Sequence, residues 1–113
     1  MATITKRVGP TAGDDYTTLI AAISGYKAAF EAGSDNYILD VEGFDENGLQ
    51  LYISWAGVSG TKTLTIRTLE GEAQRYKFIG SKTNGPAAHL VSDGLVFKDV
   101  DVHGATAAIQ IAA

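Results

Sequence analysis

Three side chains in the last part of the sequence have types and spacing that could support chemistry. Asp99, Asp101 and His103 alternate along an expected strand, so all three would face the same side of a sheet. Two carboxylates and an imidazole on one face could bind Ca²⁺, or act as acid and base in polysaccharide cleavage. A solvated strand face opposite Val100 and Val102 is the simpler interpretation, because carboxylates commonly occupy the wet side of a sheet.

The remaining acidic groups have structural explanations as well. Asp40 and Glu42 are expected on the exposed face of a strand, and Asp14 and Asp15 suit the N-terminus of a helix. The segment from Asp45 to Gly48 superficially resembles a calcium-binding loop. It lacks further ligands at the required spacing, so we expect a turn there.

Motifs for zinc, nucleophilic catalysis and phosphate binding are weak. The histidines, His89 and His103, lie on separate expected strands of a chain without cysteine, and we expect the His89 ring to be satisfied. Ser54 and Ser92 lack the paired glycines of a nucleophile elbow. The segment from Gly80 to Thr83 lacks the leading glycine and following helix of a phosphate loop, so we expect a loop. We therefore predict no catalytic, cofactor-binding or metal-binding residue, and no cofactor.

Aromatic side chains could contact a sugar ring or a partner protein. Trp55 shares one face of an expected strand with Leu51 and Ile53, which predicts that the indole lies in the core. Tyr52 points to the other face and is the better candidate for an external contact.

The composition restricts the class of protein. The chain has 113 residues, which fits one domain, and its net charge is −4. The adjacent basic pair Lys6 and Arg7 is too small for a nucleic-acid surface, so we expect no nucleic-acid partner. No apolar run has bilayer length, so we expect no membrane insertion, and the N-terminus lacks the apolar region of a signal peptide. We therefore expect synthesis in the cytoplasm of the cell that produces it.

Local patterns divide the domain into three parts. Residues 1–12 form an N-terminal strand or arm, with alternation over Thr3–Val8, residues 13–35 form a helical region, and residues 36–113 form strands. The helix would begin at an N-cap, Asp15 or Thr17, and Gly25 would kink it or divide it in two. An apolar stripe marks the face of the helix that we expect to be buried: Leu19, Ile23 and Phe30.

The strands change the parity of their apolar residues, which indicates a coiling chain. Leu95 and Phe97 have odd numbers, whereas Val100 and Val102 have even numbers, so a bend at Lys98–Asp99 is needed to keep them on one face. Candidate strands at Val41, Ile66 and His89 lie about 25 residues apart, as in a solenoid repeat. Periodicity alone leaves an irregular β-domain equally open.

Several motifs resemble the N-terminal part of right-handed parallel β-helix proteins of the pectate-lyase-like type, which occur among bacteriophage and metagenomic structural proteins. The resemblance begins at Asp15–Leu19, which matches the segment that enters the helix, and it extends to about residue 103. It continues through three later motifs: Leu51–Trp55, Thr63–Gly71 and Leu95–Val102. Ser54 and Asp99 replace glycines of the family pattern.

The resemblance implies an all-β fold, a short right-handed parallel β-helix or β-solenoid with an N-terminal capping α-helix. A β-sandwich or jelly roll with one helix is the alternative. The implied function is that of a structural virion component, of the tail-spike, fibre or head-decoration type. A carbohydrate-active or glycan-binding β-helix protein, similar to a polysaccharide lyase or hydrolase, is the alternative.

The same resemblance implies a homo-oligomer, with a trimer expected by analogy with phage fibres, and other virion proteins as partners. A polysaccharide is a further candidate partner. The apolar stretch Ala105–Ala113 has no polar cap, so we expect that the natural chain continues or that this end docks on another subunit.

Overall fold

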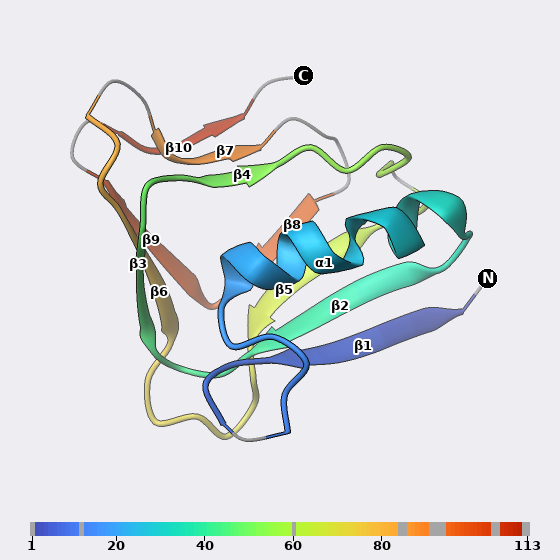
Figure 1. The fold of residues 1–113 in the computed structure, drawn as a ribbon, viewed down its shortest axis with the longest axis horizontal. Coiled ribbons are helices and arrows are strands. Elements are labelled where there is room, and N and C mark those ends of the chain that lie inside the picture. Colours follow the sequence, from blue (N-terminus) through green and yellow to red (C-terminus); the bar gives the residue numbers. More distant parts are fainter. Residues whose placement is uncertain are drawn as a thin grey trace.

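Parallel strands make up most of the fold, and one helix packs against them (Figure 1). The computed structural model describes residues 2–11, 13–59, 61–83, 86–90 and 95–104, and the backbone alone of residues 107–111. Within these residues the elements are β1 (Thr3–Val8), α1 (Leu19–Ala32), β2 (Asn36–Val41), β3 (Asp45–Gly48), β4 (Leu51–Ile53), β5 (Leu64–Thr68), β6 (Tyr76–Gly80), β7 (Pro86–Leu90), β8 (Leu95–Lys98), β9 (Val100–Gly104) and β10 (Ala107–Ile111). The protein is therefore mainly β, as the sequence predicts.

The strands form three sheets in which every neighbouring pair is parallel. The first sheet has the order β1-β2-β5-β8, the second β3-β6-β9 and the third β10-β7-β4. From β2 onward, each strand of the chain belongs to the next of the three sheets in turn (Figure 1). Each strand from β5 to β10 therefore pairs with the strand three places earlier.

The core lies between the sheets and is built from alternate strand residues. Tyr37, Leu39 and Val41 of β2 are buried, and Leu64 and Ile66 of β5 lie in register with the first two of them. Side chains that alternate in sequence point to opposite faces of a sheet, so one face of each strand is apolar. The strands predicted at Val41 and Ile66 are confirmed.

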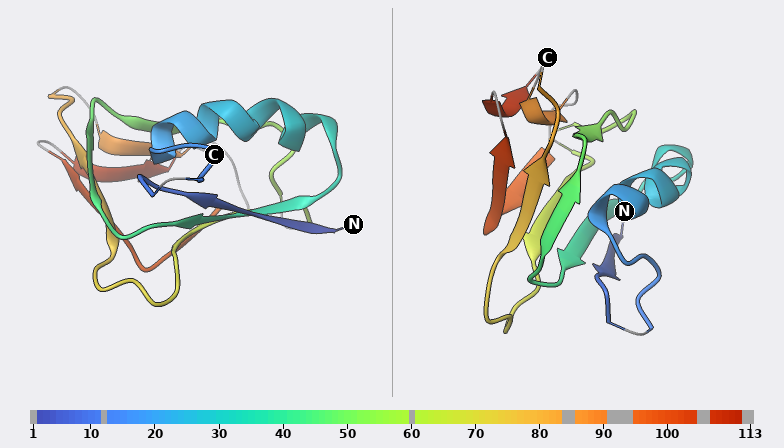
Figure 2. Two further views of the ribbon diagram at one scale, coloured as in Figure 1. Left: turned by 60° about the horizontal axis from the view of Figure 1, so that its bottom comes forward. Right: turned by 60° about the vertical axis from the view of Figure 1, so that its left-hand side comes forward.

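The helix α1 packs beside β2 and β4, on the opposite side of the molecule from β9 (Figure 2). The predicted apolar stripe is confirmed, because Leu19, Ile23 and Phe30 are buried. The predicted N-cap is wrong. Thr18 takes this position, since its backbone is extended and its hydroxyl oxygen accepts a hydrogen bond from the Ala21 amide at 3.2 Å.

Gly25 does not divide the helix, which runs unbroken from Leu19 to Ala32. The glycine instead lets an aromatic ring lie directly on the helix backbone. A Cβ atom at Gly25 would lie 2.0 Å from the hydroxyl oxygen of Tyr16, so a larger residue would displace that ring. The residue that weakens the helix locally is thus required by tertiary packing.

Glu46 connects the helix to two strands of one sheet, and it overturns the turn predicted from Asp45 to Gly48. These residues form strand β3, which pairs in register with β6. The Glu46 carboxylate is buried and accepts hydrogen bonds from the amides of Leu19 (2.7 Å) and Ile20 (3.2 Å). It also accepts one from the hydroxyl of Tyr76 at 3.0 Å. Tertiary pairing of this carboxylate outweighs the turn preference of the local sequence.

The bend predicted at Lys98–Asp99 is confirmed. Strand β8 ends at Lys98, β9 begins at Val100, and Asp99 between them has a φ of 56°. This left-handed conformation reverses the parity of the residues that follow, and aspartate tolerates it better than most residues. The Thr68 hydroxyl donates a hydrogen bond to the carbonyl oxygen of Asp99, which fixes the bend against the end of β5.

The repeat predicted from Val41, Ile66 and His89 is wrong in its details. Ile66 is in register with Leu39 in one neighbouring strand and with Phe97 in the other, at separations of 27 and 31 residues. His89 belongs to a different sheet, where it pairs with Tyr52. The spacing varies because the connections between strands differ in length.

The loop expected from Gly80 to Thr83 begins one residue later than predicted. Gly80 ends β6 and Pro86 begins β7. Within this segment the amides of Ser81 and Lys82 donate to the carbonyls of Gly48 (2.9 Å) and Leu49 (3.1 Å). Residues 84 and 85 lie outside the described residues.

Replacing Glu46 with alanine tests the connection between the helix and the strands β3 and β6. We expect Glu46→Ala to lower the free energy of unfolding by about 3 kcal/mol, because it leaves buried donors without an acceptor. Urea denaturation followed by circular dichroism measures this change. Asp45→Ala is the matched control, since Asp45 is exposed on the same strand, and its effect should stay within about 0.5 kcal/mol. Equal effects of the two substitutions would contradict the assignment.

The bend at Asp99 predicts a contrast between two substitutions at one position. Asp99→Gly should change the free energy of unfolding by no more than about 0.5 kcal/mol, because glycine adopts positive φ freely. Asp99→Val should cost about 1–2 kcal/mol, since a β-branched residue is strained there. The same denaturation experiment compares them, and a valine variant as stable as the glycine variant would rule out the left-handed bend.

Candidate functional site

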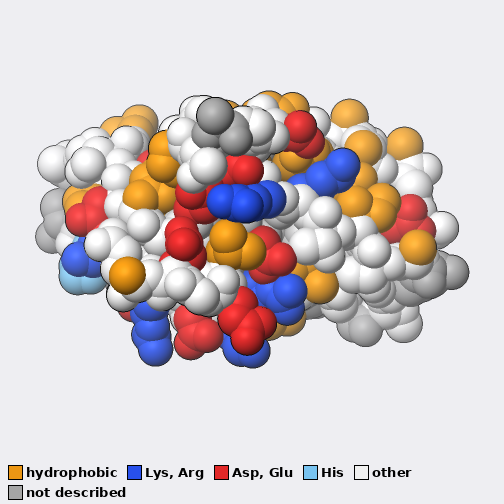
Figure 3. All heavy atoms as spheres, turned by 90° about the horizontal axis from the view of Figure 1, so that it is seen from below, with side chains coloured by type: hydrophobic (Ala, Val, Ile, Leu, Met, Phe, Trp, Pro, Cys, Tyr) orange, Lys and Arg blue, Asp and Glu red, His pale blue; other side chains and the backbone are white. Residues whose placement is uncertain are grey.

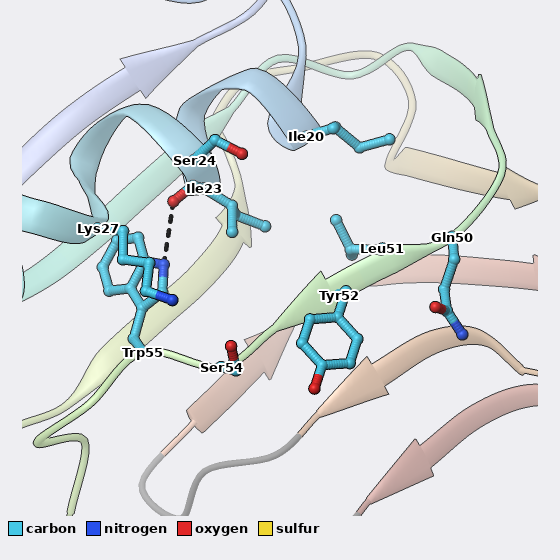
Figure 4. A pocket seen from close by; sticks show the side chains of 9 residues that line it. All are labelled: Ile20, Ile23, Ser24, Lys27, Gln50, Leu51, Tyr52, Ser54 and Trp55. Carbon is cyan, nitrogen blue, oxygen red and sulfur yellow. Dashed lines mark hydrogen bonds between the residues drawn. The ribbon is translucent and has the colours of Figure 1, made fainter.

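A cavity of about 290 Å³ lies between the helix α1 and the strand β4 (Figure 4). Four residues on one side of α1 line it, together with five residues in and beside β4: Ile20, Ile23, Ser24 and Lys27 from the helix, and Gln50, Leu51, Tyr52, Ser54 and Trp55 from the strand. A cavity of this size is at the lower limit for a small-molecule site.

The floor of this cavity is apolar and fixed in position. Ile23, Leu51 and Trp55 are buried, as the sequence predicts for the tryptophan. The indole nitrogen of Trp55 donates a hydrogen bond to the carbonyl oxygen of Ile23 at 3.0 Å (Figure 4). Because this bond joins the helix to the segment after β4, it fixes the width of the cavity.

The rim of the cavity is polar and carries one exposed aromatic ring. Ser24 and Lys27 lie on the helix side, and Ser54 lies opposite them on the strand side (Figure 4). Half of the surface of Tyr52 is exposed, so the outward position predicted for it is confirmed. The side-chain amide of Gln50 donates to the carbonyl of Pro86 at 3.0 Å. An apolar floor with a polar rim and an exposed ring is suited to binding a small polar ligand such as a sugar.

His89 lies beside this cavity. Its ring was predicted to have hydrogen-bond partners, and this prediction is wrong for one ring nitrogen. The ring packs edge-on against Tyr52, with 5.2 Å between the ring centroids, and its Nε2 atom is buried without a hydrogen-bond partner. The strand position was predicted correctly. A local sequence pattern gives no information about a partner for an imidazole that faces a neighbouring strand.

The group Asp99, Asp101 and His103 is only partly assembled in the structure. Asp99 lies in the bend, whereas Asp101 and His103 lie on β9, so the three do not share one strand. Sequence reasoning missed Arg75, whose guanidinium lies 3.5 Å from Asp99 Oδ1 and 3.7 Å from Asp101 Oδ1. Arg75 precedes β6, and only the pairing of β6 with β9 brings it to the two carboxylates.

This charged cluster is on the surface. The side chains of Arg75, Asp99 and Asp101 are 59%, 54% and 42% exposed. Water screens such pairs strongly, so their geometry is that of ordinary surface ion pairs. A cleft of about 400 Å³ adjoins the cluster, lined by residues 68–75 and Asp99.

Asp40 and Glu42, at the end of β2, were both predicted on an exposed face, and this prediction is wrong. Asp40 is half-buried and accepts hydrogen bonds from the Arg67 guanidinium, with an Nε to Oδ1 distance of 2.5 Å. This hydrogen bond raises the pKa of Arg67 above its usual value.

Glu42 is buried next to Asp14, and neither Asp14 nor Asp15 caps the helix. Asp15 accepts instead from the Tyr26 hydroxyl at 2.9 Å.

Opposite charges are interspersed over the face seen in Figure 3. Across the first sheet, Arg7, Asp40, Arg67 and Lys98 lie in register on successive strands. In this row the Asp40 carboxylate lies between two arginines and forms an ion pair with Arg67, whereas Arg67 and Lys98 are neighbours of like charge. A cross-strand pair of opposite charges stabilises the pairing of strands by about 0.2–1 kcal/mol.

The remaining sequence candidates give little chemistry. Ser54 is half-buried at the cavity, and Ser92 lies outside the described residues. Among the described residues, no group of three or more His, Cys, Asp or Glu side chains could hold a metal ion. No helix in that part of the chain is long and apolar enough to cross a membrane.

No family model, curated protein or solved structure matches the chain.

Proposed function

We propose that this chain is a structural virion component of the bacteriophage type, built as a short right-handed parallel β-helix, which acts by assembly and surface presentation. The observation that carries the proposal is the strand order. The chain passes through the three sheets in turn, and from β5 onward each strand pairs in parallel with the strand three places earlier. We describe each passage through the three sheets as one coil of the proposed β-helix.

Two arguments support a β-helix over a jelly roll. Neighbouring strands of each sheet are parallel, whereas jelly rolls and sandwiches are built mainly from antiparallel pairs. The right-handed direction follows from the strong preference for right-handed crossovers between parallel strands. The resemblance of Leu51–Trp55 and Leu95–Val102 to family motifs points to the same fold, with α1 as its capping helix.

Self-association is part of the proposal, with a trimer expected from the resemblance and other virion proteins as further partners. Strands β8 and β9 are edge strands of their sheets. Leu95 and Phe97 are only partly buried, although Leu64 and Ile66, with which they lie in register, are fully buried. Edge strands and apolar side chains that are partly exposed favour contact with another chain.

Sedimentation velocity at micromolar concentration tests the assembly. We expect an oligomer with the mass of a trimer, because association would cover the partly buried residues of β8 and β9. Val102→Lys, on β9, should shift the equilibrium toward monomer by at least about tenfold. Leu49→Lys is the matched control, since Leu49 is 63% exposed at the corner before β4. Circular dichroism checks that both variants fold, and a monomeric wild-type protein would contradict the proposal.

The cavity beside Tyr52 favours a second candidate function, glycan binding, for which a bacterial polysaccharide would be the partner. The cavity has an exposed aromatic ring, an apolar floor and a rim of hydroxyl, amide and ammonium groups. These features are typical of sites that bind sugars. The charged cluster of Arg75, Asp99 and Asp101 is the place where polysaccharide cleavage would be sought.

Binding to immobilised bacterial polysaccharides tests this second candidate. If the cavity binds sugar, Tyr52→Ala should weaken binding about tenfold through the loss of ring stacking. Val96→Ala, an exposed apolar residue on β8, should leave binding unchanged. Equal binding by the two variants would exclude the cavity. Polysaccharide turnover that disappears in Asp99→Ala and Asp101→Ala would overturn the structural proposal itself.

A further inference from the structure

Two buried carboxyl groups meet where a loop covers the end of β2. The loop leaves β1 at Val8 and returns at Tyr16, and the amide of Gly9 donates to the Tyr16 carbonyl at 2.9 Å to close it. Asp14 lies on this loop, which we call the 9–15 loop and of which the structure describes residues 9–11 and 13–15, and Glu42 follows β2 directly. Their side chains are 6% and 10% exposed. Carboxyl groups are rarely this buried unless they have partners.

Glu42 is well supplied with partners. Its carboxylate accepts hydrogen bonds from the amide of Thr11 (3.1 Å) and from the hydroxyl of Thr11. It also lies 3.9 Å from a guanidinium nitrogen of Arg7. The loop approaches so closely that a Cβ atom at Gly9 would lie 2.2 Å from Glu42 Oε2. Glycine at this position is therefore what allows the loop to lie over the carboxylate.

Asp14 lacks a hydrogen-bond partner for one of its two carboxylate oxygens. Its Oδ1 atom lies 3.3 Å from the Nε atom of Arg7, but its Oδ2 atom is buried and has no hydrogen-bond partner in the structure. A buried carboxylate oxygen without a donor is costly. A proton on this oxygen would turn it into a donor, and the neighbouring Glu42 carboxylate would be its acceptor.

The charges around the pair favour such a proton. Arg7, from β1, is the cation that contacts both carboxyl groups, and its side chain is half-exposed. Asp15 adds a negative charge from the loop. Glu72, from the connection between β5 and β6, accepts from the Gly43 amide at 2.7 Å, one residue beyond Glu42. Arg7 carries one positive charge, so it can balance only one of the two carboxylates that it contacts, and one proton on the pair removes the excess negative charge of these three groups.

We propose that Asp14 and Glu42 share one proton, and that this proton forms an acid-stabilised latch that holds the 9–15 loop on the end of β2. The latch acts on the segment that leads into the helix. Tyr16 lies on Gly25, and the Tyr26 hydroxyl donates to Asp15 at 2.9 Å, so the loop and the side of α1 are connected. Release of the proton loosens this connection.

The pH range over which the latch is stable follows from the pKa shifts of Asp14 and Glu42. The hydrogen bond that the protonated Asp14 makes to Glu42, together with burial, raises the pKa of Asp14 above 3.8, so its contribution to stability declines as pH rises from 3.8 through that raised pKa. The hydrogen bonds from Asp14 and Thr11 lower the pKa of Glu42 below 4.5, so its contribution is lost as pH falls from 4.5 through that lowered pKa. Together they place the greatest stability of the loop between pH 3.8 and 4.5.

Hydrogen exchange of the loop amides tests the latch through Asp14→Asn. The asparagine amide donates to Glu42 at every pH and cannot lose a proton. In the wild-type protein, protection of the Gly9 and Thr11 amides, corrected for the intrinsic exchange rate, should fall about tenfold from pH 4.5 to pH 8. In the variant it should stay constant. Asp45→Asn, an exposed acid on β3, is the matched control and should keep the wild-type pH profile.

A second measurement does not depend on any variant folding. Carbon NMR of the carboxyl groups in the wild-type protein should show one group of the pair that keeps its proton above the usual range for aspartate. Two carboxyl groups that both ionise in the ordinary range would overturn the proposal, as would an Asp14→Asn variant with the wild-type exchange profile. Recovery of wild-type loop protection at pH 8 on addition of CaCl₂ would also overturn it, because the pair would then be a cation site.

Discussion

The buried carboxylate of Glu46 joins the first turn of α1 to two strands, and the arrangement of the remaining elements depends on this junction. The first amides of a helix have no partners within the helix. Glu46 accepts from two of them, and Thr18 accepts from a third. The negative charge also lies at the positive end of the helix dipole. Because the same carboxylate accepts from Tyr76, one side chain fixes α1 relative to both β3 and β6.

The tyrosine in this junction keeps its proton, and so remains a donor, at pH values at which an exposed tyrosine loses it. Burial and the charge of Glu46 raise the pKa of Tyr76 well above its usual value. The hydroxyl therefore keeps its proton, and the carboxylate keeps its third hydrogen bond. A buried acid of this kind is tolerated because each of its interactions compensates for the water that it has lost.

Much of the fold could be predicted from the sequence, because short-range patterns determine it. Alternation located β1 and β4, the apolar stripe located the buried side of α1, and the change of parity located the bend at Asp99. The failures at Glu42 and Glu46 have one cause. Local rules treat a carboxylate as exposed, whereas the groups that donate hydrogen bonds to these two carboxylates lie between 26 and 31 residues away in the chain.

The candidate site was harder to predict for the same reason. Tyr52 and Trp55 were placed correctly, since alternation along one strand decides which of them is buried. The cavity itself needs Lys27 and Gln50, which come from separate elements. Arg75 meets Asp99 and Asp101 only because β6 pairs with β9. The varied lengths of the connections hide that pairing, so no fixed repeat in the sequence could reveal it.

The position of Trp55 gives the protein an internal optical reporter. The sequence contains one tryptophan, and its indole is buried between the helix and the strands, 4.9 Å from the Phe30 ring and bonded to the Ile23 carbonyl. Indole emission shifts to longer wavelength when the ring enters water. Tryptophan fluorescence therefore records separation of α1 from β4, while rearrangements confined to the distant edge at β9 leave its emission unchanged.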